Sequence, residues 1–309
     1  MTRRKARTPK PEFDVLKISK GNGKFRTIYR PRRDIKATLR TYIPVLEEIA
    51  LKLCPPNVVH GFWPARNCVS NAQMHVGPWR YTVCMDLKDF FDHCTREMLY
   101  PQIATASAWH NTPFVMSQAR DIVNQMTPDN ACRQGLPTSP AAANVCFAAC
   151  DWAILKALEI GGVKAVYSRY ADDLTFSVMT RDEVDGILGN IPKIIAEFGF
   201  VLNEKKTHVQ YAGAGRRIIT GVAVDETGVY PTRKSRRRLR AAKHRMTLPA
   251  KYGVALHRKH RAAGLAEWCK CKPPMYGRKA RQEMKDNPDE ALLIAAKARQ
   301  YAVAEVNNA

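Results

Sequence analysis

Two adjacent aspartates, Asp172 and Asp173, lie between segments of strand-forming residues and constrain the fold of this chain more than any other feature. The surrounding stretch, YSRYADDLTFS (167–177), predicts a β-hairpin with both carboxylates at its tip. Each carboxylate raises the cost of ionising the other. A cation bound by both would offset that cost, so the pattern predicts a hairpin that carries a cation site.

A third carboxylate, Asp86, lies near the C-terminal end of another predicted strand. The stretch RYTVCMDLKDFFDH (80–93) begins with the alternation that is typical of a strand. Mg²⁺ prefers oxygen ligands and accepts few protein carboxylates. Carboxylates that converge from two strands therefore suit a pair of divalent ions, one activating a hydroxyl group and the other stabilising a leaving group.

The clearest helix follows the stretch QGLPTSP (134–140). Ser139 can cap it, Pro140 suits its first turn, and Gly161-Gly162 end it. Apolar residues fill nearly every face, so we expect this helix to be deeply buried. The other expected elements are two strands within 16–33 about the turn Gly21-Asn22-Gly23, a helix over 37–53 interrupted at Pro44, a helix over 181–200 broken or kinked near Pro192, strands within 217–232, and a basic helix from Arg233.

The charge of the chain favours a polyanionic partner. Fifty Lys and Arg residues against 28 Asp and Glu give a net charge of +22. Nucleic acid is the commonest such partner, and an anionic membrane surface is the alternative. We find no apolar run of about 18 residues, which predicts no transmembrane helix. The basic N-terminus lacks the apolar region of a secretory signal.

The nine cysteines are an odd number and are scattered along the chain. Several lie within apolar stretches, as small buried hydrophobic residues do. We interpret them as reduced thiols in a cytoplasmic protein. Cys269 and Cys271 form the one close pair, and without a second pair they are weak support for a zinc site.

Three segments together resemble the catalytic boxes of reverse transcriptases. YADD (170–173) resembles the YxDD box, DLKDFF (86–91) the first catalytic box, and QGLPTSP (134–140) the box between them. Order and spacing agree, and three ordered boxes are far more specific than one four-residue pattern.

The resemblance narrows to the retron reverse transcriptases of bacteria. NAQMH (71–75) matches their NAxxH element, and ITGVAVD (219–225) resembles their VTG element with Ile219 in place of Val. The matched stretch runs from about Lys20 to about Arg240.

The resemblance implies an α+β fold of the right-hand polymerase type, with fingers, a palm of antiparallel sheet and helices, and a basic helical thumb. The expected boundaries are a flexible basic arm over 1–15, fingers over 16–79, a palm over 80–225 into which about 95–133 of the fingers is interleaved, and a thumb and RNA-binding region over 226–309.

The resemblance also implies an enzyme, an RNA-directed DNA polymerase that uses two Mg²⁺ ions, with Mn²⁺ as the alternative metal. Asp86 and Asp172 would bind both ions, and Asp173 would support them. Lys206 in the stretch LNEKKT (202–207) would protonate the leaving pyrophosphate, with Lys205 as the alternative.

Further residues are assigned to dNTP and RNA by the same resemblance. Lys20 and Arg26 would clamp the triphosphate of the dNTP or touch template phosphates, Phe91 would exclude a 2′-hydroxyl or pack in the core, and Gln134 and Gly135 would approach the nascent base pair. The residues expected to bind RNA are Asn71, His75, Arg236, Arg237, Arg240 and Lys243, with a structural role as the alternative for Asn71 and His75.

The resemblance to retron enzymes implies that the template is a structured noncoding RNA and the product an RNA-linked single-stranded DNA (msDNA). It also implies anti-phage defence with a separate effector protein, while the oligomeric state stays open. The alternatives are another bacterial reverse transcriptase (group II intron-like or defence-associated), an RNA polymerase, which Phe91 disfavours, and a non-catalytic RNA-binding scaffold, which the intact aspartates disfavour.

Overall fold

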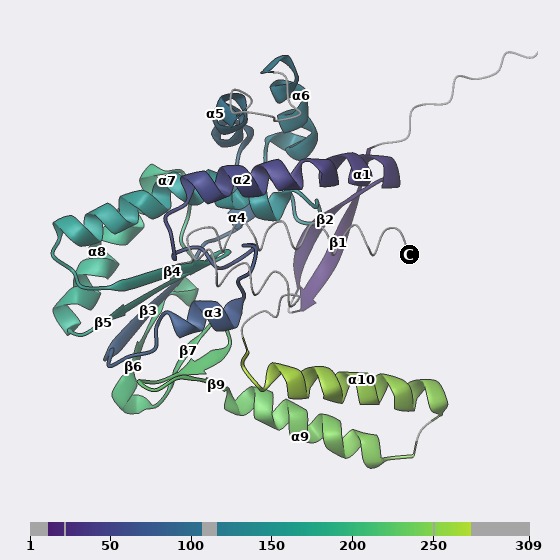
Figure 1. Ribbon diagram of the computed structural model, residues 1–309, viewed down its shortest axis with the longest axis vertical. Helices are drawn as coiled ribbons and strands as arrows, with labels where there is room; N and C mark the ends of the chain where they lie inside the picture. Colours follow the sequence, from purple (N-terminus) through teal and green to yellow (C-terminus); the bar gives the residue numbers. More distant parts are fainter. Residues whose placement is uncertain (1–11, 22, 107–115, 250, 273–309) are drawn as a thin grey trace, which may run out of the picture. The chain divides into compact units, whose positions relative to one another are not determined.

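A computed structural model describes residues 12–21, 23–106, 116–249 and 251–272 (Figure 1). Most of the expected N-terminal arm, and the expected thumb region beyond Lys272, lie outside these residues. The chain divides into two compact units, each assembled from two separate stretches of sequence. Unit 1 comprises Met1–Ala50 and Phe91–Cys146, and unit 2 comprises Leu51–Phe90 and Phe147–Ala309.

Unit 1 contains the predicted N-terminal hairpin. Strands β1 (Phe13–Gly21) and β2 (Lys24–Pro31) pair antiparallel, as expected for a turn rich in glycine. The helix expected over 37–53 is divided at Tyr42, and Pro44 lies in the first turn of the second helix, where its missing N–H is tolerated. The helical elements here are α1 (Arg33–Thr41), α2 (Ile43–Leu53), α5 (Arg96–Ala106), α6 (Met116–Met126) and the short η1 (Pro128–Asn130).

Unit 2 contains a four-stranded antiparallel sheet in the order β4-β5-β3-β6. The strands are β3 (Tyr81–Asp86), β4 (Val166–Tyr170), β5 (Asp173–Val178) and β6 (His208–Tyr211). The expected strand at 80–93 ends at Asp86, because Phe90–His93 form a short helix, α4. In β5 every residue after Asp173 is buried, so this strand lies in the core of the unit.

A second, three-stranded sheet packs on the short helix α3 (Cys68–Gln73). Its strands are β7 (Arg217–Ile219), β8 (Val222–Val224) and β9 (Val229–Pro231), in that order. Their shared core contains Val69, Ala72, Ile219, Val222, Val224 and Cys271. The NAxxH-like and VTG-like elements, far apart in sequence, therefore pack against each other.

Helix α7 (Ser139–Ile160) begins and ends where its caps predicted, and most of it is buried. By length and composition it is apolar enough to cross a membrane, although Asp151, Lys156 and Glu159 interrupt its apolar residues. In its most apolar window 67% of the residues are buried inside the structure, as in the core helix of a soluble protein.

Three further helices complete unit 2. Helix α8 (Arg181–Glu197) starts with a capping box formed by Thr180 and Glu183 and runs through Pro192 as one helix rather than breaking there. Small helical turns η2 (Glu204–Lys206) and η3 (Ala212–Ala214) flank β6. The basic segment forms α9 (Arg233–Thr247), as predicted, and continues into α10 (Tyr252–Trp268).

A buried ion pair joins strand β4 to helix α7. Nη2 of Arg169 lies 2.7 Å from Oδ2 of Asp151, and both side chains are fully buried. Nε of Arg169 donates to the same carboxylate, and the Tyr167 hydroxyl donates to its Oδ1 at 2.7 Å. Burying two charges is costly, and this set of hydrogen bonds offsets the cost.

Removing one partner of this pair leaves the other charge buried and unpaired, whereas removing one partner of an exposed pair leaves the other in water. We expect Arg169→Met to lower the free energy of unfolding by about 3–5 kcal/mol. The matched variant Arg181→Met, which removes the exposed (i, i+4) pair with Asp185, costs less than about 1 kcal/mol. Urea unfolding of both variants makes the comparison, and equal losses would contradict a special role for the buried pair.

Candidate active site

Three carboxylates meet at one end of the four-stranded sheet. Asp86 is the last residue of β3, Asp173 is the first of β5, and the two are register partners. Directly opposed residues of an antiparallel pair point to the same face, with Cβ atoms about 4.5–5.5 Å apart. Asp172 lies in the turn before β5, and its carbonyl oxygen accepts a hydrogen bond from Leu87 N at 2.8 Å.

The other two carboxylates disfavour the charged form of Asp173. The pKa of Asp173 is raised to about 6, first by loss of hydration, then by the charges of Asp172 and Asp86. Asp173 has exposed surface as a whole residue. Its carboxyl group is nevertheless surrounded by enough protein that loss of hydration is the largest cause of its raised pKa. Repulsion of this kind is what a bound cation would relieve.

Lys206 supplies one positive charge to this cluster. Its Nζ lies 2.7 Å from Oδ1 of Asp86, whose side chain is only 11% exposed. The hydrogen bond to Asp86, and the charges of Asp86, Asp172 and Asp173, raise the pKa of Lys206. Of the two lysines considered from sequence, Lys206 is therefore the one that pairs with the carboxylate cluster.

Sequence reasoning missed a second partner of Asp86. The backbone N–H of Asn203 donates to the Asp86 carbonyl oxygen at 2.8 Å, and Nδ2 donates to Oδ2 at 3.3 Å. Together Asn203 and Lys206 contact both carboxylate oxygens of Asp86. The available signal was the position of Asn203 three residues before Lys206 in the same short box.

The donor set fits a divalent cation chemically. Carboxylate oxygens are the ligands that Mg²⁺ prefers, and a bound cation would relieve the repulsion that raises the pKa of Asp173. Within the described ranges, no group of three or more His, Cys, Asp or Glu side chains is already arranged to enclose a metal ion. In this structure Oδ1 of Asp86 is paired with the ammonium group of Lys206.

The residues expected to bind dNTP belong to unit 1, and their roles stay predictions. Arg26 is exposed on β2, whereas the side chain of Lys20 lies outside the described residues. Phe91 is half-buried in α4, not on a strand as assumed from sequence. Its neighbour Phe90 is the core aromatic, packed against Phe147 and Phe200 in unit 2.

The loop that carries Gln134 and Gly135 rests on strand β2. Tyr29 N donates to the carbonyl oxygen of Gln134 at 2.8 Å. Gly135 has a φ of +105°, and a Cβ there would overlap the Tyr29 carbonyl oxygen and lie 2.6 Å from Cγ2 of Ile28. Close packing inside unit 1 therefore requires a glycine here, and the expected approach of Gly135 to a base pair stays a prediction.

The expectation that His75 binds RNA was wrong, because its side chain is fully buried. Nδ1 lies 2.9 Å from the Ser177 hydroxyl and Nε2 lies 2.7 Å from that of Ser168, so the ring bridges β5 and β4. Burial lowers the pKa of His75 to about 3, and the ring is neutral. His75 also lies beyond the end of α3 rather than on its face, so the alternative structural role is the one that fits.

Asn71 is likewise fully buried in α3, which corrects its predicted contact with RNA. Among the described residues, neither Nδ2 nor Oδ1 of its amide has a hydrogen-bond partner. An orphaned buried amide costs about 1–3 kcal/mol, which buried water commonly avoids.

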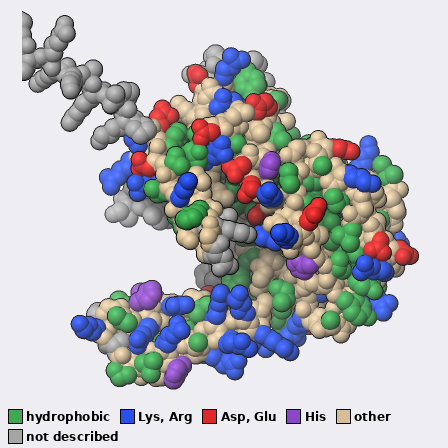
Figure 2. Space-filling view, turned by 180° about the vertical axis from the view of Figure 1, so that it is seen from behind, with side chains coloured by type: hydrophobic (Ala, Val, Ile, Leu, Met, Phe, Trp, Pro, Cys, Tyr) green, Lys and Arg blue, Asp and Glu red, His purple; other side chains and the backbone are tan. Residues whose placement is uncertain are grey.

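The predicted RNA-binding residues of α9 are all exposed (Figure 2), and Lys and Arg side chains gather along the α9–α10 hairpin. A hollow of about 610 Å³ is lined by Arg233, Arg236, Arg237, Leu239, Arg240 and Cys269. Four guanidinium groups without an acid among these lining residues suit an anion such as phosphate.

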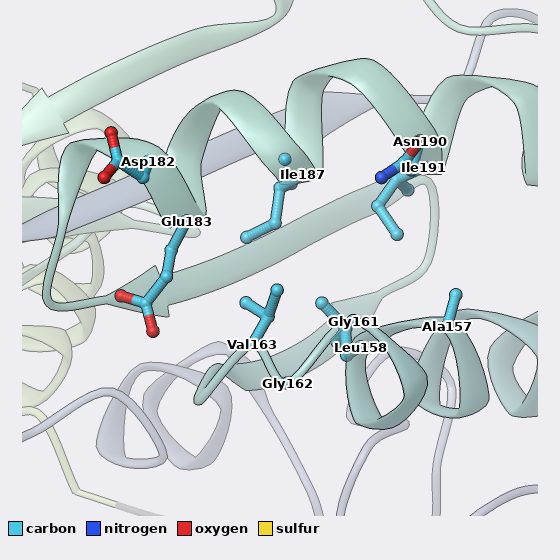
Figure 3. A pocket seen from close by; sticks show the side chains of 11 residues that line it. Ala157, Leu158, Gly161, Gly162, Val163, Asp182, Glu183, Ile187, Asn190 and Ile191 are labelled. Carbon is cyan, nitrogen blue, oxygen red and sulfur yellow. The ribbon is translucent and has the colours of Figure 1, made fainter.

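A separate hollow of about 280 Å³ lies between the end of α7 and helix α8 (Figure 3). Ile187 and Val163 point toward each other across it. Glu183 at its edge is engaged in capping α8 through Thr180. This hollow therefore lacks the converging polar groups of the carboxylate cluster, which we take as the candidate active site.

Comparison with known proteins shows the family to which the chain is similar. The family model described as "Reverse transcriptase (RNA-dependent DNA polymerase)" matches residues 15–248. The chain is 32% identical over 260 residues to the retron Mx65 reverse transcriptase of Myxococcus xanthus, covering 80% of this chain and 58% of that one. It is 29% identical over 221 residues to the retron Ec86 reverse transcriptase of Escherichia coli, covering 72% and 65%. The chain thus spans less than two thirds of the length of these relatives, and the predicted resemblance to retron enzymes is confirmed.

Solved structures show the same fold at low sequence identity. Apo telomerase from Candida tropicalis aligns with a TM-score of 0.55 and 12% identity, covering 97% of this chain and 59% of that one. Telomerase from Candida albicans, solved with the TWJ fragment of telomeric RNA, gives a TM-score of 0.54 and 12% identity, covering 92% and 58%. The predicted α+β right-hand polymerase fold is confirmed by these neighbours.

Removing one charge from the cluster should stabilise the metal-free protein. Because the pKa of Asp173 is raised, the penalty for its ionisation develops between about pH 4 and its folded pKa of about 6, and is complete above that. In EDTA at pH 7.5 we expect Asp173→Asn to raise the melting temperature by roughly 2–4 °C, the shift that about 1 kcal/mol produces. The gain should shrink toward pH 4.

The control for this measurement is Asp121→Asn on the exposed face of α6, where relief of clustered charge does not apply. Thermal unfolding followed by circular dichroism reports both variants. A lower melting temperature for Asp173→Asn at pH 7.5 would contradict the repulsion.

Proposed function

Because the chain belongs to the reverse transcriptase family, we propose that it is an RNA-directed DNA polymerase. The observation that carries the proposal is the meeting of Asp86, Asp172 and Asp173 at one sheet end, with Lys206 bonded to Asp86. In the proposed reaction, a primer hydroxyl attacks the α-phosphate of a dNTP, the new phosphodiester bond forms, and pyrophosphate leaves.

The carboxylate cluster would hold two divalent ions, Mg²⁺ or alternatively Mn²⁺. When bound, such ions activate the attacking hydroxyl and stabilise the leaving pyrophosphate. Asp86 and Asp172 are the proposed ligands, with Asp173 in support. Asn203 orients Asp86 by bonding both its backbone and its carboxylate.

Lys206 has two proposed duties in turn. In the metal-free protein its ammonium group partly neutralises the cluster. Its raised pKa keeps it protonated at neutral pH, so the proposed donor holds a proton for the leaving pyrophosphate before the reaction. The side chain is 61% exposed, which leaves it free of packing that would hold it on Asp86.

Unit 1 would supply recognition of the incoming nucleotide. We propose that Lys20 and Arg26 contact its triphosphate, that Phe91 blocks a ribose 2′-hydroxyl, and that Gln134 and Gly135 lie near the new base pair. Arg26 is exposed on the β1–β2 hairpin, as a phosphate contact requires. In this assignment unit 1 provides fingers, the four-stranded sheet provides the palm, and α9–α10 provide the thumb.

Similarity to the Mx65 and Ec86 enzymes supports a retron as the natural setting. The proposed template is a structured noncoding RNA, from which a 2′-hydroxyl would start synthesis, and the product is msDNA. Anti-phage defence with a separate effector protein follows from the same proposal. The nine cysteines are free thiols, which supports the proposed reducing, cytoplasmic location. We also propose that the protein has no membrane partner.

Exposed cations on α9 support RNA binding through phosphates. Arg236, Arg237, Arg240 and Lys243 project from a helix that contains no acidic residue. Phosphate contacts of this kind release counterions, and so they weaken as salt rises.

Loss of one carboxylate should abolish synthesis. We expect Asp172→Ala to reduce dNTP incorporation on a primed RNA template by about 100-fold or more, because a metal ligand with transition-state contact supplies several kcal/mol. Primer extension with Mg²⁺ measures this, with Asp121→Asn as the control that retains activity. Equal incorporation by wild type and Asp172→Ala would refute the catalytic assignment.

Neutralising α9 should change the salt dependence of RNA binding. We expect each of Arg236→Gln, Arg237→Gln, Arg240→Gln and Lys243→Gln to flatten the slope of log affinity against log salt by about 0.7–0.9 if that residue contacts one phosphate. Filter binding with a structured RNA at several salt concentrations measures the slope. Lys156→Gln and Lys193→Gln, exposed on α7 and α8, are the controls, and an equal flattening by the controls would contradict a specific α9 surface.

A further inference from the structure

A loop formed by residues 57–66 packs against the turn that carries Asp172. His60 N donates to the Arg169 carbonyl oxygen at 2.8 Å, and Arg169 N donates to the Val58 carbonyl oxygen at 2.8 Å. Val59 and Arg169 thereby form a parallel bridge beyond the named strands. The 57–66 loop therefore extends the pairing of β4 up to the residue just before Tyr170 and Ala171.

Gly61 is the point of closest approach between this loop and the turn. A Cβ at Gly61 would overlap the backbone nitrogen of Ala171, and it would lie 2.7 Å from the carbonyl carbon of Tyr170 and 2.9 Å from Cα of Ala171. These atoms are backbone, so they cannot swing aside as the end of a side chain can. The residue after Ala171 is Asp172, a proposed metal ligand.

The loop is held shut by its own side chains. Nη1 of Arg66 donates to the Val59 carbonyl oxygen at 2.7 Å, and Nη2 donates to Oδ1 of Asn57 at 3.2 Å. The His60 ring, buried and neutral because burial lowers its pKa to about 3, lies 2.9 Å from the Ser70 hydroxyl at the start of α3. The loop is thus tied across its own ends and to α3.

The turn that carries Asp172 is also held by hydrogen bonds to residues outside the loop. Nη1 of Arg169 donates to the Ala171 carbonyl oxygen at 3.4 Å, and the same guanidinium is fixed by the buried carboxylate of Asp151. Leu87 N holds the Asp172 carbonyl oxygen. An added atom at Gly61 therefore has to break one of these contacts or displace the turn.

Several residues of the loop and the turn have unfavourable backbone dihedral angles. Among the described residues, nine non-glycine positions have positive φ, and four of them belong to this assembly: Asn57, Phe62, Ala65 and Ala171. A positive φ is unfavourable for residues other than glycine, and it persists only where surrounding contacts impose it. For Asn57 and Ala171, the hydrogen bonds from Arg66 and Arg169 given above are such contacts.

We propose that Gly61 is a positioning residue for the reaction, and that the 57–66 loop sets the place of the Asp172 carboxylate through Gly61's contact with the Tyr170–Ala171 backbone. This inference rests on the proposed function, because it assumes that Asp172 binds a divalent ion. Neither Gly61 nor its loop contributes a ligand; the effect passes through the turn.

The test is Gly61→Ala in the full chain, read by two independent measurements. Electron paramagnetic resonance titration with Mn²⁺ should show weaker binding by about 10-fold or more, the scale on which misplaced ligand supports act. Primer extension should show kcat lower by about 10- to 100-fold, with KM for dNTP changed by less than about threefold, since unit 1 recognises the nucleotide. The matched control is Gly186→Ala in α8, where a Cβ would meet nothing within 4 Å.

The outcomes separate this inference from the proposed function. If wild type and Gly186→Ala bind Mn²⁺ and extend primers while Gly61→Ala behaves the same, the positioning role is overturned and the polymerase stands. If wild type neither binds Mn²⁺ nor extends, the proposed function fails and takes this inference with it. Should Gly61→Ala not fold, as judged by circular dichroism, Arg66→Leu decides the matter: it opens the loop without a clash, and unchanged Mn²⁺ affinity and kcat would overturn the proposal.

Discussion

The close placement of three carboxylates is the physical constraint on which unit 2 depends, because their repulsion has to be offset by neighbouring residues. Register pairing of β3 with β5 places Asp86 opposite Asp173, and the tight turn adds Asp172. Loss of hydration and the charges of Asp172 and Asp86 disfavour the ionised form of Asp173, whose pKa is raised. The structure opposes this with Lys206 on one oxygen of Asp86 and Asn203 on the other.

Behind the carboxylates, the sheet is braced by buried polar groups rather than by apolar packing alone. Arg169 and Asp151 tie β4 to α7, and His75 bridges hydroxyl groups of β4 and β5. Arg217 adds to the second network by donating to the carbonyl oxygen of His75 at 2.9 Å. Such networks specify one arrangement because any other leaves a buried polar group unsatisfied. The hairpin that bears the acids is thus fixed on the side away from solvent.

The sequence predicts the elements well where the signal is local. Caps bound α7, glycines turn the first hairpin, and the acids lie at strand ends, because each pattern is set by residues within a few positions of one another. Contacts between distant segments carry no such signal. Asn203 and Gly61 look like ordinary loop residues until the fold brings them to Asp86 and Ala171. His75 was misjudged for the same reason, since only the tertiary structure shows that it is enclosed by two strands.

The chain passes between the two units three times, near residues 50, 90 and 146. Neither unit is therefore formed by one continuous stretch of sequence. Each can fold completely only after both of its stretches have left the ribosome. Strands β1 and β2 are made before the rest of unit 1, which is complete only when Cys146 has been made. Strand β3 in turn waits with both edges unpaired until β5 and then β6 are synthesised. An unpaired strand is a site for unwanted association until its partner strands have been made.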